Sequence, residues 1–314
     1  MQIPPSAILP CSFLLLSASH AGAALLAYEG FGTAPGGYSH TGGYVSSGDA
    51  LVFGNSGPGT GQNPPASGFT ADGWVLGGQQ SANTYAKVQD QQMSYSTGGM
   101  ALVTTTGQTS IFRQGNTGTT TRTYSRNLNL GITDTFPASI YMSGMFSFEG
   151  SVIASSINFL TTYTVDSSNR SFGLSIAADG TINFTGNGAT GGSSTLSPLI
   201  AGTTYFFVMK IEEGGGSSGG RDLLSFYLNP VDLTSEAANT VGATRDAYYI
   251  NPGAYDMHGV RFGAAPDTDQ AFIFDELRIG NTWADVVPHI PIPEVSSTLM
   301  AITAMGVSMS RRRR

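Results

Sequence analysis

The stretch "QAFIFDELRIGNTWADVVP", residues 270–288, carries the clearest strand signal in the chain. Apolar residues lie on both sides of the acidic pair Asp275-Glu276, and the pattern is not a clean alternation of apolar and polar positions. Strict alternation is typical of a strand with one solvated face, whereas a strand buried on both faces reads as a mainly apolar run. We therefore predict a central strand in which Phe272, Phe274 and Glu276 share one face.

Several other segments have the composition and spacing of antiparallel strands. The segment "IYMSGMFSF", 140–148, predicts a strand with one solvated face, and "SFGLSIAADGTINFTG", 171–186, predicts a hairpin around Asp179-Gly180. The segments "TTYFFVMKIEEG", 203–214, and "LLSFYLNP", 223–230, each place their larger apolar residues on one face. With 42 glycines and only 11% charged residues, the chain favours an all-β jelly-roll sandwich of two antiparallel sheets.

The acidic residues do not form a catalytic pattern. The spacing Glu-x-Asp-x-x-Glu, which places a pair of carboxylates in the cleft of a glycosidase, does not occur. Asp275 and Glu276 are adjacent and should face opposite sides of a strand, so we expect one of them to contact Arg278 or a backbone amide. The histidines outside the N-terminal segment are scattered, so we assign no catalytic residue and no transition-metal site.

Two segments are candidates for binding. The stretch "DAYYINPGAYDMHG", 246–259, combines aromatic rings with polar groups, as sugar-binding sites commonly do. Its candidate ligand-binding residues are Tyr248, Tyr249, Asn251, Tyr255 and Asp256. In "APDTDQ", Asp267 and Asp269 could supply oxygen ligands to calcium, which is the one cofactor that the sequence suggests.

The N-terminal residues 1–23 predict a secretory signal peptide. An apolar run too short to span a bilayer precedes Ala21-Gly22-Ala23, which places small residues at Ala21 and Ala23 for cleavage. Cys11, the single cysteine, lies within this segment, so the mature chain would hold no disulfide. Residues 24–310 keep all 21 acidic residues but only 10 of the 14 basic ones, a balance that favours neither nucleic acid nor an anionic membrane as a partner.

The C-terminal residues predict a membrane-retention tail. Residues 295–310 carry no charge, and Arg311, Arg312, Arg313 and Arg314 follow them directly. A run of this length is short for a spanning helix but adequate for a transient one, held with its arginines on the cytoplasmic side.

This tail resembles the PEP-CTERM sorting signal of Gram-negative bacteria. Pro293 and Glu294 match the first two motif positions, Val295 stands where the family has a second proline, and Gly306 is a small residue within the apolar helix. The resemblance implies processing by an exosortase and transfer to the cell surface or extracellular matrix. Some descriptions of this tail class refer to ice-binding proteins.

The body resembles the laminin-G-like, concanavalin A-like domains of such exported proteins. The resemblance rests on "LLAYEGF" at 25–31, on "LLSFYLNP", and on the closing "FDELRIGNTWADVVP" at 274–288, which implies a last strand lying beside the first. It divides the chain into a signal peptide, 1–23, a sandwich, 24–290, and a sorting tail, 291–314.

Three functions remain open on this basis. The first is a non-catalytic surface or matrix protein with weak contacts to polysaccharide or neighbouring proteins. The second is a hydrolase of extracellular polysaccharide, whose carboxylates would have to meet from different strands. The third is ice binding, suggested by the tail and by the threonines in "VTTTGQTS", 103–110, and "NTGTTTRTY", 116–124. These clusters lack the regular period that a flat ice-binding face requires, so this function ranks last.

Overall fold

The structure is a computed structural model. It describes residues 25–31, 69, 75–77, 84–89, 91–105, 107–113, 122–128, 138–149, 157–163, 172–177, 179–190, 198–217, 219–248, 259–264 and 271–292.

The described elements are almost entirely β, and every strand pairing among them is antiparallel. The strands are β1 (Leu25–Glu29), β2 (Val75–Gly77), β3 (Thr84–Gln89), β4 (Ser96–Thr97), β5 (Met100–Leu102), β6 (Gln108–Arg113), β7 (Arg122–Asn127), β8 (Ser139–Glu149), β9 (Ile157–Tyr163), β10 (Phe172–Ile176), β11 (Ile182–Thr190), β12 (Tyr205–Glu212), β13 (Asp222–Leu228), β14 (Ala243–Tyr248), β15 (Gly259–Ala264), β16 (Ala271–Gly280) and β17 (His289–Pro291). Two short helices are η1 (Glu236–Ala238) and α1 (Trp283–Val286).

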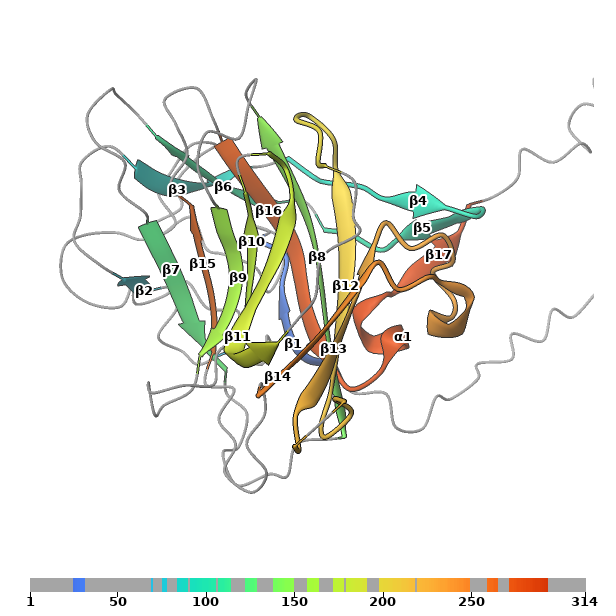
Figure 1. Cartoon of the computed structure of the whole chain (residues 1–314). Coiled ribbons are helices and arrows are strands. Elements are labelled where there is room, and N and C mark those ends of the chain that lie inside the picture. The colour runs from blue at the N-terminus through green and yellow to red at the C-terminus, as the bar shows by residue number, and fades with distance from the viewer. Residues whose placement is uncertain are drawn as a thin grey trace, which may run out of the picture.

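Most strands follow one hydrogen-bonded order, β2-β7-β15-β9-β10-β11-β14-β13-β12-β8-β16-β6-β3, which folds into two facing layers (Figure 1). The pairing of β11 with β14 joins the layers. Aromatic rings pack between them, with Phe184 of β11 lying 5.1 Å from Phe226 of β13, centroid to centroid. The prediction of a mostly antiparallel β protein is therefore confirmed.

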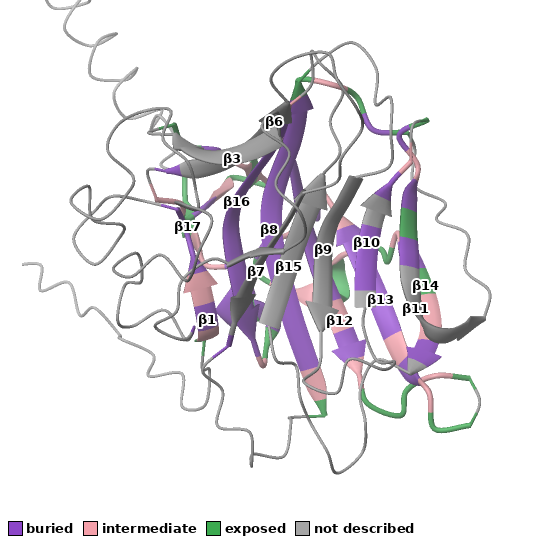
Figure 2. Ribbon diagram, turned by 90° about the vertical axis from the view of Figure 1, so that its left-hand side faces the viewer, coloured by how far each residue is buried: buried purple, intermediate pink, exposed green. Residues whose placement is uncertain are grey.

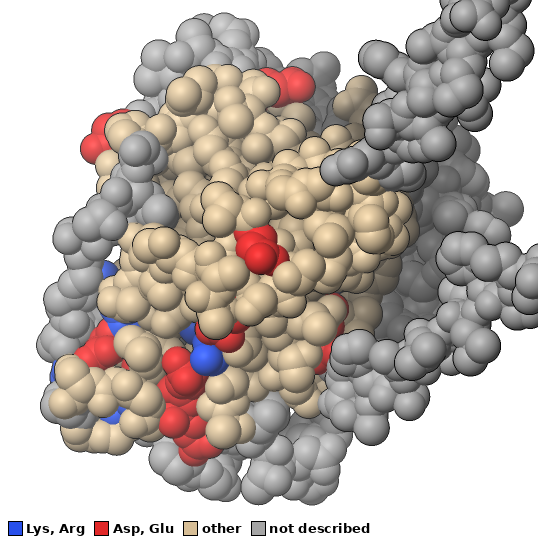
Figure 3. All heavy atoms as spheres, turned by 90° about the vertical axis from the view of Figure 1, so that its right-hand side faces the viewer, with Lys and Arg blue, Asp and Glu red and all other residues tan. Residues whose placement is uncertain are grey.

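The layer that contains β8, β12 and β16 is buried on both faces, as the purple of β8 and β16 in Figure 2 shows. One face meets the other sheet layer. The second face lies under a covering layer, which we define as residues 91–105, 229–242 and 281–292 and which includes β4, β5, β17, η1 and α1. The exposed surface of this covering layer is mostly uncharged (Figure 3). The prediction of a solvated face for 140–148 is wrong, because side chains distant in sequence cover that face.

The covering layer is held by hydrogen bonds to backbone carbonyl oxygens. The indole Nε1 of Trp283 donates to Leu233 at 3.0 Å, and the Tyr95 hydroxyl donates to Pro230 at 2.8 Å. The Ser143 hydroxyl of β8 donates to Val286 at 2.6 Å. These bonds tie the covering segments to each other and to the sheet.

Other local predictions are confirmed. In β12, Phe207, Met209 and Ile211 all face the core between the two sheet layers. The turn between β10 and β11 has Gly180 at a φ of 82°, as the Asp-Gly dipeptide indicated. Helix α1 was not predicted; it begins at a capping box in which Thr282 and Asp285 satisfy each other's backbone N–H groups.

Candidate functional site

Strand β16 contains a β-bulge at its acidic pair. Asp275 lies opposite Met145 of β8, whereas Arg278 lies opposite Ser143, so β16 has an additional residue at this point. Glu276 takes a left-handed φ of 56°, which is unusual for a residue with a side chain. The bulge reverses the alternation, so that Leu277 joins Phe274 in the core, and the prediction that Glu276 shares the face of Phe274 is wrong.

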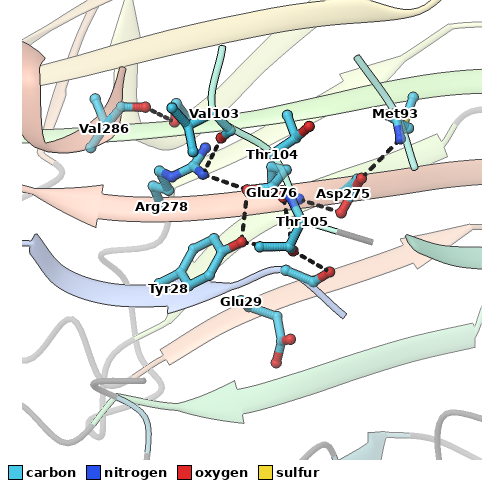
Figure 4. Close-up of polar contacts among 12 residues, drawn as sticks. Tyr28, Glu29, Met93, Val103, Thr104, Thr105, Asp275, Glu276, Arg278 and Val286 are labelled. Atoms are coloured by element: carbon cyan, nitrogen blue, oxygen red, sulfur yellow. Dashed lines mark hydrogen bonds and ion pairs between the residues drawn. The ribbon is translucent and has the colours of Figure 1, made fainter. Parts of the chain in front are cut away.

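The bulge lies where the edge partner of β16 changes. Strand β6 pairs with Ala271–Phe274, and β1 pairs with Leu277–Gly280, so that β16 lies beside the first strand as the resemblance implied. At the gap, the Asp275 carboxylate accepts a hydrogen bond from the Met93 backbone N–H at 3.3 Å, and Glu276 accepts one from the Thr105 N–H. The two carboxylates therefore bind backbone donors of the covering layer at a break in the sheet (Figure 4).

Glu276 is the centre of a buried ionic network (Figure 4). Its Oε2 lies 2.5 Å from Nη2 of Arg278 and 2.9 Å from the Tyr28 hydroxyl. Nη2 of Arg278 also donates to the Val103 carbonyl at 2.7 Å, and its guanidinium lies 4.9 Å from the centroid of the Tyr28 ring. The expected contact between an acidic residue and Arg278 or a backbone amide is confirmed.

Burial sets the proton affinities in this network. It raises the pKa of the Tyr28 hydroxyl, and the adjacent Glu276 charge adds to the shift. Burial also raises the pKa of Asp275 well above its usual range, again with a contribution from Glu276. Both carboxylic side chains are 0% exposed, so neither meets a solute from solution. We interpret the network as structural: it joins the first strand, the last long strand and the covering layer.

A second set of polar residues lies where η1 of the covering layer meets the sheet, and part of it reaches solvent. We call it the tyrosine–glutamate cluster; its members are Tyr141, Lys210, Glu212, Tyr227 and Glu236. The hydroxyls of Tyr141 and Tyr227 donate to the two carboxylate oxygens of Glu236 at 2.6 and 2.8 Å. Nζ of Lys210 lies 3.3 Å from Glu236 and 3.2 Å from Glu212. A short helix, η1, is therefore fixed to three sheet strands through one carboxylate.

The charges of this cluster offset one another. Burial by itself raises the pKa of Glu236, but the hydrogen bonds from the two tyrosines and the charge of Lys210 outweigh it and lower the pKa. Burial lowers the pKa of Lys210, but contacts with Glu212 and Glu236 give a net increase. The pKa values of Tyr141 and Tyr227 are raised, first by burial and then by Glu236. At neutral pH, Glu236 is ionised and both tyrosines are protonated, which suits neither a general acid at Glu236 nor a general base at tyrosine.

The cluster predicts an acid-dependent loss of stability. A carboxyl whose pKa is depressed in the folded state stabilises the fold above its unfolded pKa, and this contribution disappears as pH falls through the folded value. We therefore expect the melting temperature of Glu236→Gln to lie below that of the wild type at neutral pH. The difference should shrink as the pH falls below 4.5, the ordinary value for this carboxyl. Thermal melts of both proteins across this range check the prediction, and a gap that widens in acid would contradict it.

Most residues that the sequence singled out lie outside the described residues. These are Ala21, Ala23, Tyr249, Asn251, Tyr255, Asp256, Asp267, Asp269, Pro293, Glu294, Val295, Gly306 and Arg311 to Arg314. For Tyr248, the backbone pairs with Asn187 at the end of β14. In the first threonine cluster, Thr105 donates its hydroxyl to Glu276 at 3.0 Å, and Thr104 accepts from Gln92 at 2.6 Å.

Sequence reasoning missed the tyrosine–glutamate cluster. One signal was available, because Lys210 is one of only two lysines and interrupts the apolar strand 205–212. The members of the cluster come from four elements, β8, β12, β13 and η1, and only Lys210 and Glu212 share one of them. Within the described residues, no three His, Cys, Asp or Glu side chains gather as metal ligands, and no helix has the length and apolar character to cross a bilayer.

No protein-family model and no curated protein sequence matches this chain. Among solved structures, an endo-β-1,4-glucuronan lyase from the fungus Trichoderma reesei aligns with a TM-score of 0.38 and 10% identity over 64% of this chain and 92% of that chain. The cellulose induced protein Cip1 aligns with a TM-score of 0.35 and 14% identity over 63% and 91%. The alginate lyase Aly36B, in complex with alginate trisaccharide, aligns with a TM-score of 0.36 and 12% identity over 60% and 86%. We infer the function from this chain's own residues.

Proposed function

We propose that this chain is a non-catalytic exported protein of the cell surface or extracellular matrix, with a concanavalin A-like sandwich that makes weak contacts with polysaccharide. An exosortase would process it through the C-terminal tail, with the arginines as a transient inner-membrane stop. The proposal that the protein is non-catalytic rests on one observation: the acidic side chains between the sheet and its covering layer are buried or paired. Asp275 and Glu276 are fully buried, and Glu236 accepts hydrogen bonds from two tyrosines and pairs with a lysine.

One observation favours the alternative, an extracellular polysaccharide hydrolase. Glu212 of β12 and Glu236 of η1 both contact Nζ of Lys210, so two carboxylates from different elements lie close together. A glycosidase needs one of its two carboxyl groups to be protonated for acid catalysis. The lowered pKa of Glu236 opposes that role for this residue.

Processing of the tail is tested by mass spectrometry of the chain expressed in a Gram-negative host that contains an exosortase. We expect the protein recovered from the cell surface to end near Pro293-Glu294, without Arg311 to Arg314. The same chain in a host that lacks the exosortase is the control and should keep its tail in the membrane fraction. A soluble surface form that still ends in Arg314 would show that the tail is not a sorting signal.

The recovered protein also provides the test of polysaccharide contact. Binding to a panel of acidic and neutral polysaccharides, with calcium and with a chelator, is measured together with the release of reducing ends. Binding without release supports the proposal, and dependence on calcium would point to Asp267 and Asp269. Release of reducing ends that is abolished in Glu236→Gln would favour the hydrolase, and no binding in either condition would leave a purely structural role.

A further inference from the structure

Five large apolar side chains of the covering layer are exposed, and three of them lie in or directly beside the paired strands β5 and β17, whereas Val231 and Val241 lie in the segment 229–242. Val103, Ile290 and Ile292 are 40%, 56% and 44% exposed. In the antiparallel pair of β17 with β5, Ile290 lies opposite Ala101, and His289 lies opposite the buried Leu102. Residues directly opposite each other point to the same side of a sheet, and successive residues alternate. Val103, Ile290 and Ile292 therefore share the side that points away from the core, which we call the outer face.

The segments that form the outer face contain no carboxylate side chain. Residues 91–105 and 287–292 contain no Asp, Glu, Lys or Arg, although the chain as a whole has a net charge of −7. Figure 3 shows that this side of the molecule is mainly uncharged, with one acidic group near the centre of the view and most of the other acidic and basic side chains toward the lower left. The overall negative charge therefore does not prevent this particular face from approaching an anionic lipid surface.

The outer face lies close in sequence to the uncharged C-terminal run, which points to a lipid bilayer as its partner. Ile292 is followed by Pro293 and Glu294 only, before the uncharged run 295–310 begins. Three peptide units of 3.8 Å each keep the Cα atoms of Ile292 and Val295 within about 11 Å of each other. If that run enters a bilayer, Ile292 lies within about 11 Å of the point of entry, and is therefore held at or just outside the lipid headgroup layer, which is about 5–8 Å thick on each side.

We propose that, in the membrane-anchored form of this protein, the outer face rests on the bilayer with Val103, Ile290 and Ile292 inserted among the lipid headgroups. Exposed aliphatic side chains gain free energy on leaving water, and a juxtamembrane position supplies the contact without a separate binding step. The inference rests on the proposed function, because it requires the tail to be in the membrane. It adds a defined orientation of the sandwich before the tail is removed.

Single-cysteine reporters test this orientation in the full chain. In a Cys11→Ser background, an environment-sensitive fluorophore is attached to Val103→Cys, Ile290→Cys, Ile200→Cys or Met305→Cys. The protein is reconstituted in vesicles of phosphatidylethanolamine and phosphatidylglycerol that contain a lipid-attached quencher. Ile200 is a matched control, because it is an isoleucine that is 68% exposed on a different turn. Met305 reports on the tail itself.

We expect lipid quenching and a blue shift of emission at Met305, Val103 and Ile290, and neither at Ile200. Quenching at Met305 with no quenching at Val103 and Ile290 would overturn the orientation and leave the tail anchor intact. No quenching at Met305 would overturn the anchor, and the orientation with it. A blue shift at Val103 and Ile290 that is already complete without vesicles would show that protein, such as the tail folded back, covers the outer face.

Discussion

Replacement of Glu276 by alanine is expected to lower the free energy of unfolding by about 3–5 kcal/mol, because it leaves a buried charge without its partner. Arg278 is only 4% exposed, and Glu276 is its ion-pair partner. The Thr105 N–H also loses its acceptor, and the Tyr28 hydroxyl keeps only its contact with the Thr105 hydroxyl. Chemical denaturation of the wild type and the variant measures the difference.

Four further variants separate the ion pair from the other contacts: Glu149→Ala, Glu276→Gln, Arg278→Met and the double variant of the last two changes. Glu149→Ala removes an exposed glutamate and should change stability by no more than about 0.5 kcal/mol. The double variant Glu276→Gln with Arg278→Met should be less destabilised than Glu276→Gln alone, since removing both charges removes the unpaired one. A double variant that loses the full sum of the single effects would show that the two side chains act independently.

Replacement of Phe206 by alanine is expected to cost about 3–5 kcal/mol, as much as the same change at Phe207. The two residues are adjacent in β12, and both are 0% exposed. Phe207 packs between the sheet layers, 5.8 Å from Phe226 between ring centroids. Phe206 packs against the covering layer, with its ring centroid 5.2 Å from that of Tyr95. Each truncation should therefore leave a cavity, one on either side of the sheet.

The comparison of the two phenylalanines measures how firmly the covering layer is packed. Ile290→Ala serves as the control within that layer, because Ile290 is exposed and its truncation should be nearly neutral. Equal losses at Phe206 and Phe207 in denaturant unfolding would support a third layer as well packed as the sandwich core. A large loss at Phe207 with almost none at Phe206 would mean that the covering layer contributes little to stability.

Local patterns were enough to predict several of the main strands. In β12 and β13 the alternation of residues such as Phe207 and Phe226 gave the face that enters the core, because successive side chains of a strand point to opposite sides. The Asp179-Gly180 turn was also predictable from neighbouring residues. A tight hairpin turn requires a positive φ, which few residue types besides glycine adopt readily. The role of Asp275 or Glu276 as a partner of Arg278 also followed from their isolation in an apolar strand.

The same patterns failed wherever a partner distant in sequence decided the outcome. The segment 140–148 has the composition of a half-solvated strand, yet Tyr141 and Met145 are buried under residues that come from other parts of the chain. The reversal of alternation at Glu276 comes from the bulge against β8, which lies where the neighbour of β16 changes from β6 to β1.

The sequence by itself determined the β class and the course of several main strands, and its two terminal segments predict export, because each inference depends on residues that are neighbours along the chain. Only the tertiary structure decided which faces are covered and what the acidic residues do. Glu276 meets Thr105 across 171 positions and Tyr28 across 248, and Glu236 meets Tyr141 across 95. The burial and charge pairing of a side chain depend on such contacts, and therefore on the fold as a whole.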